Sequence, residues 1–139
     1  MKKSTLVFAG AALVLGLSSV QAAEFKVIAN SSVGVSDVSS DDLKAVFLGT
    51  KSSLGDAHIS PVLEKSGPAH EAFLKECLGK NDSALTNYYR SLVFTGKGSM
   101  PKAFDSDDAV VQYVAKTKGA IGYVGAAAAA SGVKTLSIK

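Results

Sequence analysis

The sequence predicts an α/β domain in which a mostly parallel sheet is flanked by helices, in two or three layers. Strand-like and helix-like segments alternate near both ends of the chain, which favours parallel strands joined by crossover helices. The helical segments also carry residues typical of helix starts and ends. No internal repeat is evident, so we expect one compact domain with one core.

The N-terminal segment 1–22 is typical of a secretory signal peptide. Two lysines precede an apolar run from Thr5 to Leu17, and Val20-Gln21-Ala22 supplies small residues at positions −3 and −1 of a cleavage site. The run is shorter than the roughly 20 residues that a membrane-spanning helix needs. We therefore expect an exported mature domain, Ala23–Lys139. An uncleaved N-terminal anchor is the alternative.

Composition and charge exclude several classes of protein. The formal net charge is +3, and the two lysines of the signal segment contribute two of these charges. Tryptophan is absent and basic residues do not interleave with aromatic ones, so nucleic acid is not an expected partner. The single cysteine, Cys77, excludes an intrachain disulfide. His58 and His70 have no partners at ligand spacing, so we expect no metal site and no cofactor.

Four strands are predicted from apolar patterns bounded by turn residues. Pro61 indicates an edge or an irregularity in the second strand, because proline cannot donate a ladder hydrogen bond. Residues 33–38 are expected to form an extended linker, and residues 50–57 a loop that turns at Gly55-Asp56. The predicted strands are Phe25–Ala29, His58–Leu63, Ala120–Val124 and Val133–Ile138.

The first of four predicted helices has the clearest boundaries. Ser39 is its expected N-cap, with Asp42 near the acidic position of a capping box, and Gly49 ends it. Pro68 suits the first position of the second helix, where its missing N–H costs nothing. The first helix has the apolar stripe Leu43, Val46 and Phe47, and the second helix ends at Gly79. Asp82 or Ser83 is the expected cap of the third helix. Asp105 or Ser106 is the expected cap of the fourth helix, which ends at Gly119.

The strongest local candidate for a binding site is Ser66-Gly67-Pro68-Ala69-His70, where a strand ends and a helix begins. Free N–H groups and the positive end of a helix suit an oxyanion. The Ser66 hydroxyl could add a donor, and Lys65 or His70 could add positive charge. Pro68 removes one donor, and a simple helix start with proline at its first position explains the same pattern.

Two further segments are expected near the same crevice. Thr95-Gly96-Lys97-Gly98-Ser99 contains two glycines that allow close approach to a ligand, although it lacks the spacing of a P-loop. Ser31 follows the first strand, and ligands of open α/β sheets gather beyond the carboxyl ends of strands. A flexible turn and a solvated loop are the alternative interpretations.

Catalysis has little support in the sequence. Ser66 and His70 stand four residues apart, but a serine–histidine pair needs an orienting third group and an oxyanion hole. Three aspartates near residue 106 lie at a predicted helix start, where the helix dipole alone favours acids. We therefore expect a protein that is not an enzyme.

Three segments go beyond local patterns: Leu43–Gly49 followed by Ile59–Val62; Ser66–Phe73; and Phe94–Gly96 with Pro101, followed by Gly119–Val124. Their order and spacing resemble the PstS-like family of periplasmic phosphate-binding proteins of ABC transporters. The resemblance covers about Val27 to Ile138, and its most specific part is the Gly-Ala-Ile-Gly-Tyr-Val strand.

This resemblance implies a single lobe of a type II periplasmic-binding-protein fold, a periplasmic location and an oxyanion ligand. Full-length members of the family hold phosphate between two lobes. Their phosphate loop usually reads Ser-Gly-Thr, with an arginine a few residues earlier. Here Ser66 and Gly67 match by position, Pro68 replaces the threonine, and Lys65 is the nearest cation. We therefore expect weak phosphate binding unless a second chain closes the site.

The leading interpretation is a periplasmic binding module for phosphate or a similar oxyanion, working with an ABC transporter permease or another membrane complex. The alternative is an interaction or sensory module that has lost tight phosphate binding and docks a membrane complex, a sensor or a second copy as a homodimer. A hydrolase using Ser66 and His70 ranks last. The expected ligand-binding residues are Ser66, Gly67, Lys65, Ala69, His70, Thr95, Gly96, Lys97 and Ser31.

Overall fold

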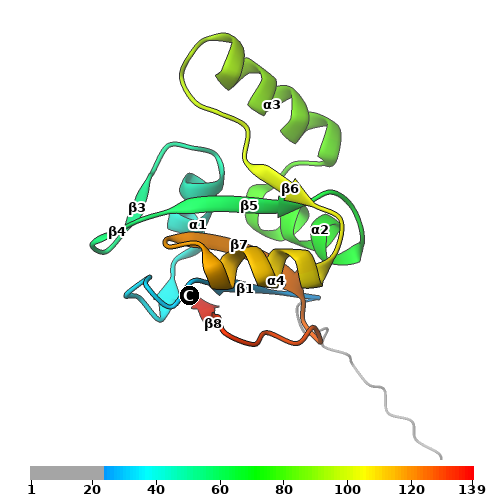
Figure 1. Ribbon diagram of the computed structural model, residues 1–139. Helices are drawn as coiled ribbons and strands as arrows, with labels where there is room; N and C mark the ends of the chain where they lie inside the picture. The colour runs from blue at the N-terminus through cyan, green and yellow to red at the C-terminus, as the bar shows by residue number, and fades with distance from the viewer. Residues whose placement is uncertain (1–23) are drawn as a thin grey trace, which may run out of the picture.

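The computed structural model describes residues 24–139, so the predicted signal segment and its cleavage site lie outside the described residues. Within this range, no helix has the length and apolar character to cross a membrane. A six-stranded sheet carries helices on both faces (Figure 1). Its strand order is β2 (Asp37–Val38), β8 (Lys134–Ile138), β1 (Phe25–Ala29), β7 (Ala120–Gly125), β5 (Ser60–Glu64) and β6 (Lys102–Phe104).

The sheet is mixed, and three of its five strand pairings are parallel. β5 runs parallel to β6 and to β7, and β2 runs parallel to β8. β1 is antiparallel to both of its neighbours, β7 and β8. The prediction of an α/β domain with a mostly parallel sheet is therefore confirmed. The first strand, however, runs against β5 and β7.

Four short strands occur where none was predicted. β2 lies in the expected linker, and β6 begins directly after residue 101, where the loop of residues 95–101 ends. β3 (Ser53–Leu54) and β4 (Ala57–His58) form a hairpin within the expected loop. Because His58 pairs with Ser53, the second predicted strand begins at Ser60 instead. Such short strands depend on pairing more than on their own residues, so a local pattern does not reveal them.

Two helices begin where the sequence predicts. In α1 (Ser40–Phe47) the Ser39 hydroxyl oxygen accepts a hydrogen bond from the Asp42 N–H at 3.1 Å. α2 (Pro68–Phe73) starts with proline and continues as the π-helix η1 (Leu74–Leu78), which stops at Gly79. The unpredicted π-turn leaves the expected end of this helix unchanged.

The other two helices differ in how closely their N-caps match the predicted residues. α3 (Asp82–Phe94) is capped by Asn81, whose side chain accepts from the Ala84 N–H at 2.8 Å. The prediction of Asp82 or Ser83 as the cap is therefore wrong by at least one residue. α4 (Asp107–Lys116) is capped by Ser106, one of the two residues predicted for this role.

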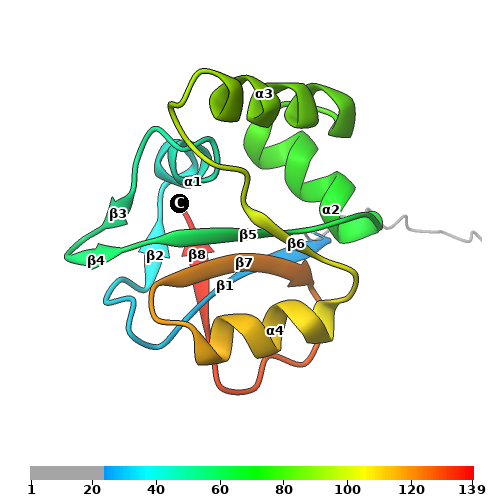
Figure 2. The same cartoon turned by 45° about the horizontal axis from the view of Figure 1, so that its top comes forward.

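The sheet has a separate core on each face. α4 covers one face, where Val110 and Val114 pack with Val62. α1, α2 and η1 cover the other face (Figure 2), and the ring of Phe73 stacks on that of Tyr123 there with centroids 4.0 Å apart. α3 is the outermost layer, and its Tyr89 hydroxyl donates to the Phe47 carbonyl of α1. The sheet and the helices on its two faces thus form three layers, as one of the two predicted arrangements has it, and α3 lies outside them.

Candidate functional site

The carboxyl end of β5 leads through Lys65 and Ser66 into the start of α2. Gly67 precedes the helix with φ of +109°, and no side chain caps the first turn. The Glu71 N–H donates to the Gly67 carbonyl at 3.0 Å. The N–H groups of Ala69 and His70 lie ahead of this first helical bond and have no acceptor within the helix. This helix start therefore presents free donors beside Ser66.

The space above Gly67 is open, because a β-carbon built on this residue would meet no atom within 4 Å. Glycine is required by the backbone angle instead, since a side chain is disfavoured at this positive φ. A ligand can therefore approach the backbone here without displacing another part of the protein.

Ser66 borders a cavity of about 570 Å³ between the second helix and the start of α3. Two lysines and two acids line it, so the charges of its wall balance. Its polar and charged lining includes Ser66, Glu71, Lys75, Lys80 and Asp82.

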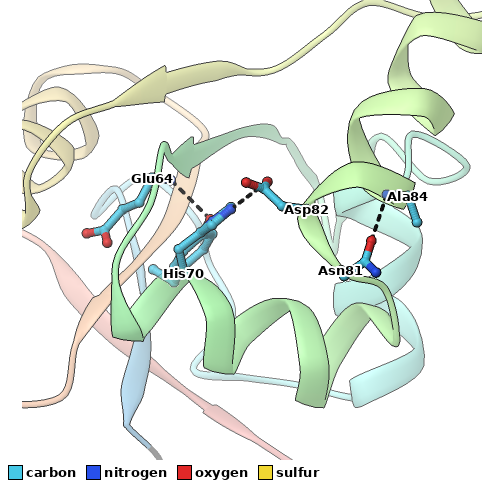
Figure 3. A network of polar contacts seen from close by, with 6 residues as sticks. Glu64, His70, Asn81, Asp82 and Ala84 are labelled. Carbon is cyan, nitrogen blue, oxygen red and sulfur yellow. Dashed lines mark hydrogen bonds and ion pairs between the residues drawn. The ribbon is translucent and has the colours of Figure 1, made fainter.

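Two residues of the cavity lining, His70 and Asp82, belong to a chain of hydrogen bonds (Figure 3). The Tyr123 hydroxyl accepts from the Glu64 N–H at 3.0 Å and lies 2.5 Å from Nδ1 of His70. Nε2 of His70 lies 3.0 Å from Oδ1 of Asp82. Burial raises the pKa of Tyr123, so its hydroxyl keeps the proton that it donates to Nδ1. The Nε2–H of His70 then donates to Asp82.

His70 therefore does not serve the role that the sequence suggested. The side chain is buried, and both ring nitrogens already have partners. No ring nitrogen remains to contact an anion or to take a proton from Ser66. Only its backbone N–H has no acceptor within the helix, and the arrangement argues against the serine–histidine hydrolase.

Lys65 is the cation nearest the loop, but it forms an ion pair with an acidic side chain. Its Nζ lies 3.3 Å from Oδ1 of Asp105, and both side chains are largely exposed. An exposed pair of this kind is held weakly, with a net contribution of about 0–1 kcal/mol. Lys65 is thus free to exchange Asp105 for a ligand at small cost.

Glu64, next to the candidate loop, is a buried acid that the sequence analysis missed. The residue is 5% exposed, and its Oε2 has no hydrogen-bond partner among the described residues. Its backbone N–H donates to the Tyr123 hydroxyl. Burial, and then the neighbouring Asp107, raise the pKa of Glu64 to about 8. Glu64 stands two residues after the buried Val62, so strand alternation was the available signal for its inward position.

The structure corrects the expectation for Ser31. Because β1 is antiparallel to β7, its carboxyl end meets the amino ends of β7 and β5, away from Ser66. The Asn30 N–H donates to the Ala120 carbonyl at 2.9 Å, and the Gly119 N–H donates to the Ser32 hydroxyl at 3.0 Å. The polar residues after the first strand therefore tie down the start of β7.

The loop 95–99 is also separate from Ser66. The Thr95 hydroxyl donates to the Ser91 carbonyl at 2.8 Å, and Gly96, with φ of +70°, follows the end of α3. Gly98 and Ser99 line a different cavity, near Ser60 at the amino end of β5. Thr95, Gly96 and Lys97 border neither this cavity nor that of Ser66. Of the predicted site, only Lys65, Ser66, Gly67, Ala69 and the backbone of His70 stay together.

The fold is similar to that of lobes of solved phosphate transport binding proteins. Similar solved structures include a protein described as a phosphate ABC transporter substrate-binding protein with bound phosphate, from Clostridium perfringens, at 18% identity and a TM-score of 0.63. PstS from Borrelia burgdorferi matches at 14% identity and 0.62. An ABC-type phosphate transport receptor from Vibrio cholerae matches at 12% and 0.56.

These matches cover 83% or 84% of this chain but only 44%, 47% and 46% of the three proteins, in the order given. The chain thus spans less than half their length. No family model and no curated protein matches it. At such low identities the likeness establishes the fold, and at that level the resemblance to a single PstS-like lobe is confirmed.

Proposed function

We propose that this protein is a non-enzymatic oxyanion-binding module of the phosphate-receptor type. The observation that carries the proposal is the uncapped start of α2, where backbone N–H groups without a helical acceptor follow Ser66 at the carboxyl end of β5. Such a helix start attracts anions through its donors and its dipole. The fold, similar to lobes of phosphate-binding transport proteins, supports the same ligand class.

Phosphate is the oxyanion that we propose first, with low affinity. Pro68 offers no N–H, Lys65 already has Asp105 beside it, and the site lies on one open lobe. Ligand sites bind well when they bury most of the ligand's surface. A millimolar Kd for the isolated lobe, on the order of −4 kcal/mol, fits these limits. A second chain that covered the loop would lower the Kd.

Calorimetric titration of the phosphate-stripped protein with phosphate, and with sulfate as a control, tests the proposal. Ser66→Asp places a negative charge where the anion would lie and should abolish the heat of binding. Ser36→Asp adds the same charge to an exposed loop and should leave binding unchanged. Equal binding in both variants would remove the Ser66 loop from the site.

Location and transport partner are part of the same proposal. The segment 1–22 supports export to the periplasm with cleavage after Ala22. An ABC transporter permease is the partner that the similar proteins suggest. N-terminal sequencing of protein released from the periplasm should begin at Ala23, and cross-linking in the cell should capture the permease.

A second candidate function is protein interaction, and one exposed apolar patch favours it. At the end of α3, Val93 is 53% exposed and Phe94 91%, and Met100 in the following loop is 51% exposed. Large exposed apolar groups gathered in one place are typical of contact surfaces. Sedimentation should then show a phosphate-independent homodimer or complex that Phe94→Ser disrupts.

A further inference from the structure

A second cavity, of about 450 Å³, lies at the amino end of β5, opposite the end that carries Ser66. Its walls come from α1, the hairpin β3–β4, β5 and the loop that follows α3. The glycine-rich loop predicted as a binding element contributes Gly98 and Ser99 here. A glycine at 98 also lets the loop pass close to Leu92, since an added β-carbon would lie 3.4 Å from that side chain.

The ionisable side chains that line this cavity include basic residues but no acid. Lys51, His58 and Lys102 line it, and no aspartate or glutamate does. Lys51 is held in place by Asp42, with Nζ and Oδ1 2.9 Å apart, while Lys102 has no acidic partner within 4.0 Å among residues 24–139. The Ser66 cavity, in contrast, is lined by two acids as well as two lysines.

The rest of the wall combines three serines, at 52, 60 and 99, with a group of apolar and aromatic side chains. Ile59, Leu92, Met100 and Tyr113 line it together with Pro61. Met100 is half-exposed at the rim, and Ile59 is buried beneath. An inorganic anion would leave these groups in water, and a neutral apolar molecule would leave the lysines unmatched. The two features together select a molecule with one anionic end and an apolar body.

We propose that this cavity is a second binding site, which takes a small organic carboxylate with an apolar body and places its carboxylate beside Lys102. The volume suits a ligand of this kind, since small-molecule sites span roughly 300–1,000 Å³. Lys102 lies in β6 where that strand first pairs with β5, so its backbone is fixed by the sheet. The proposal does not depend on phosphate binding at Ser66, because the two cavities share no residue.

Titration of the ¹⁵N-labelled protein with 2-naphthoate, followed by NMR, tests this site. The amide signals of Gly49, Gly98 and Ser99 should shift and saturate, while those of Gly67 and Ala69 should not. The neutral analogue 2-naphthylmethanol should bind at least tenfold more weakly. Phosphate should leave the signals of Gly98 and Ser99 unmoved.

Two exposed lysines provide matched variants. Lys102→Met removes the charge but keeps an apolar stem, and it should weaken naphthoate binding about five- to tenfold. Lys118→Met makes the same change outside the cavity and should have no effect. The proposal is overturned if naphthoate does not saturate the Gly98 and Ser99 shifts. Equal binding of the alcohol, or equal loss in both variants, overturns it too.

Discussion

The Tyr123 hydroxyl links β7 to β5 and to α2, because it lies 2.5 Å from Nδ1 of His70 and accepts the Glu64 N–H at 3.0 Å. Through His70 the link reaches Asp82 at the start of α3. One buried side chain thus holds the end of the strand, the helix that begins the candidate site and the next helix in fixed relation. The candidate loop lies between these points.

Tyr123→Phe should destabilise the protein by about 1–3 kcal/mol, because it leaves the buried Nδ1 of His70 and the Glu64 N–H without a partner. Urea unfolding measures this loss, with Tyr113→Phe as the control, since no hydrogen bond of the Tyr113 hydroxyl occurs among the described residues. Equal midpoints for the two variants would show that the chain of hydrogen bonds contributes little.

Glu64→Gln should change how stability depends on pH. In the folded protein the pKa of Glu64 is raised to about 8 from an ordinary value of 4.5, so the folded state binds the extra proton between these values. The free energy of unfolding of the wild type should therefore fall as the pH rises from about 5 to about 8, by ~2–4 kcal/mol. Below pH 4.5 the contribution is fully present.

The variant should lack this fall, because glutamine does not titrate. Chemical unfolding at several pH values, expressed as the difference between wild type and Glu64→Gln, isolates the contribution of Glu64 to the free energy of unfolding. A difference that stays constant from pH 5 to pH 8 would contradict the raised pKa.

Gly67→Ala should cost about 1–3 kcal/mol, because its φ of +109° with ψ of 172° is a conformation that residues with a β-carbon rarely adopt. Gly34→Ala is the control: its added β-carbon also meets no atom within 4 Å, and its φ is not positive. Thermal unfolding of both variants should show a lower Tm for Gly67→Ala alone. Similar Tm values for the two variants would mean that the backbone of the loop adjusts to accept alanine at position 67, which would contradict the prediction.

Ser39→Ala should destabilise the protein by about 1 kcal/mol, because the N-cap bond to Asp42 is lost. Ser40→Ala alters the neighbouring exposed position, whose side chain makes no cap bond, and should have little effect. Denaturant midpoints compare the two. A larger loss for Ser40→Ala would show that Ser39 is not the cap that matters.

Local signals predicted the starts of three of the four helices, whereas the cap of α3 lies one residue before the two expected positions. Ser39, Pro68 and Gly79 act on groups within five residues of themselves, so the sequence is enough to place them. The apolar stripe of α1 followed from its helical spacing in the same way. The lobe fold followed from the order of several such segments.

The composition of the site was decided by contacts between distant residues. Ser31 was placed near Ser66 on the assumption that strands share one direction, and the antiparallel β1 sends it to the other end of the sheet. The loop 95–99 was chosen for its glycines, which do not reveal which end of the sheet it reaches. The role of His70 depends on Tyr123, 53 residues later, and on Asp82. By itself the sequence determined the four helices and the four longer strands, though not the four short strands, because capping and periodicity act over a few residues. Only the tertiary structure decided which of these elements meet, because strand direction and buried hydrogen bonds join segments far apart in the chain.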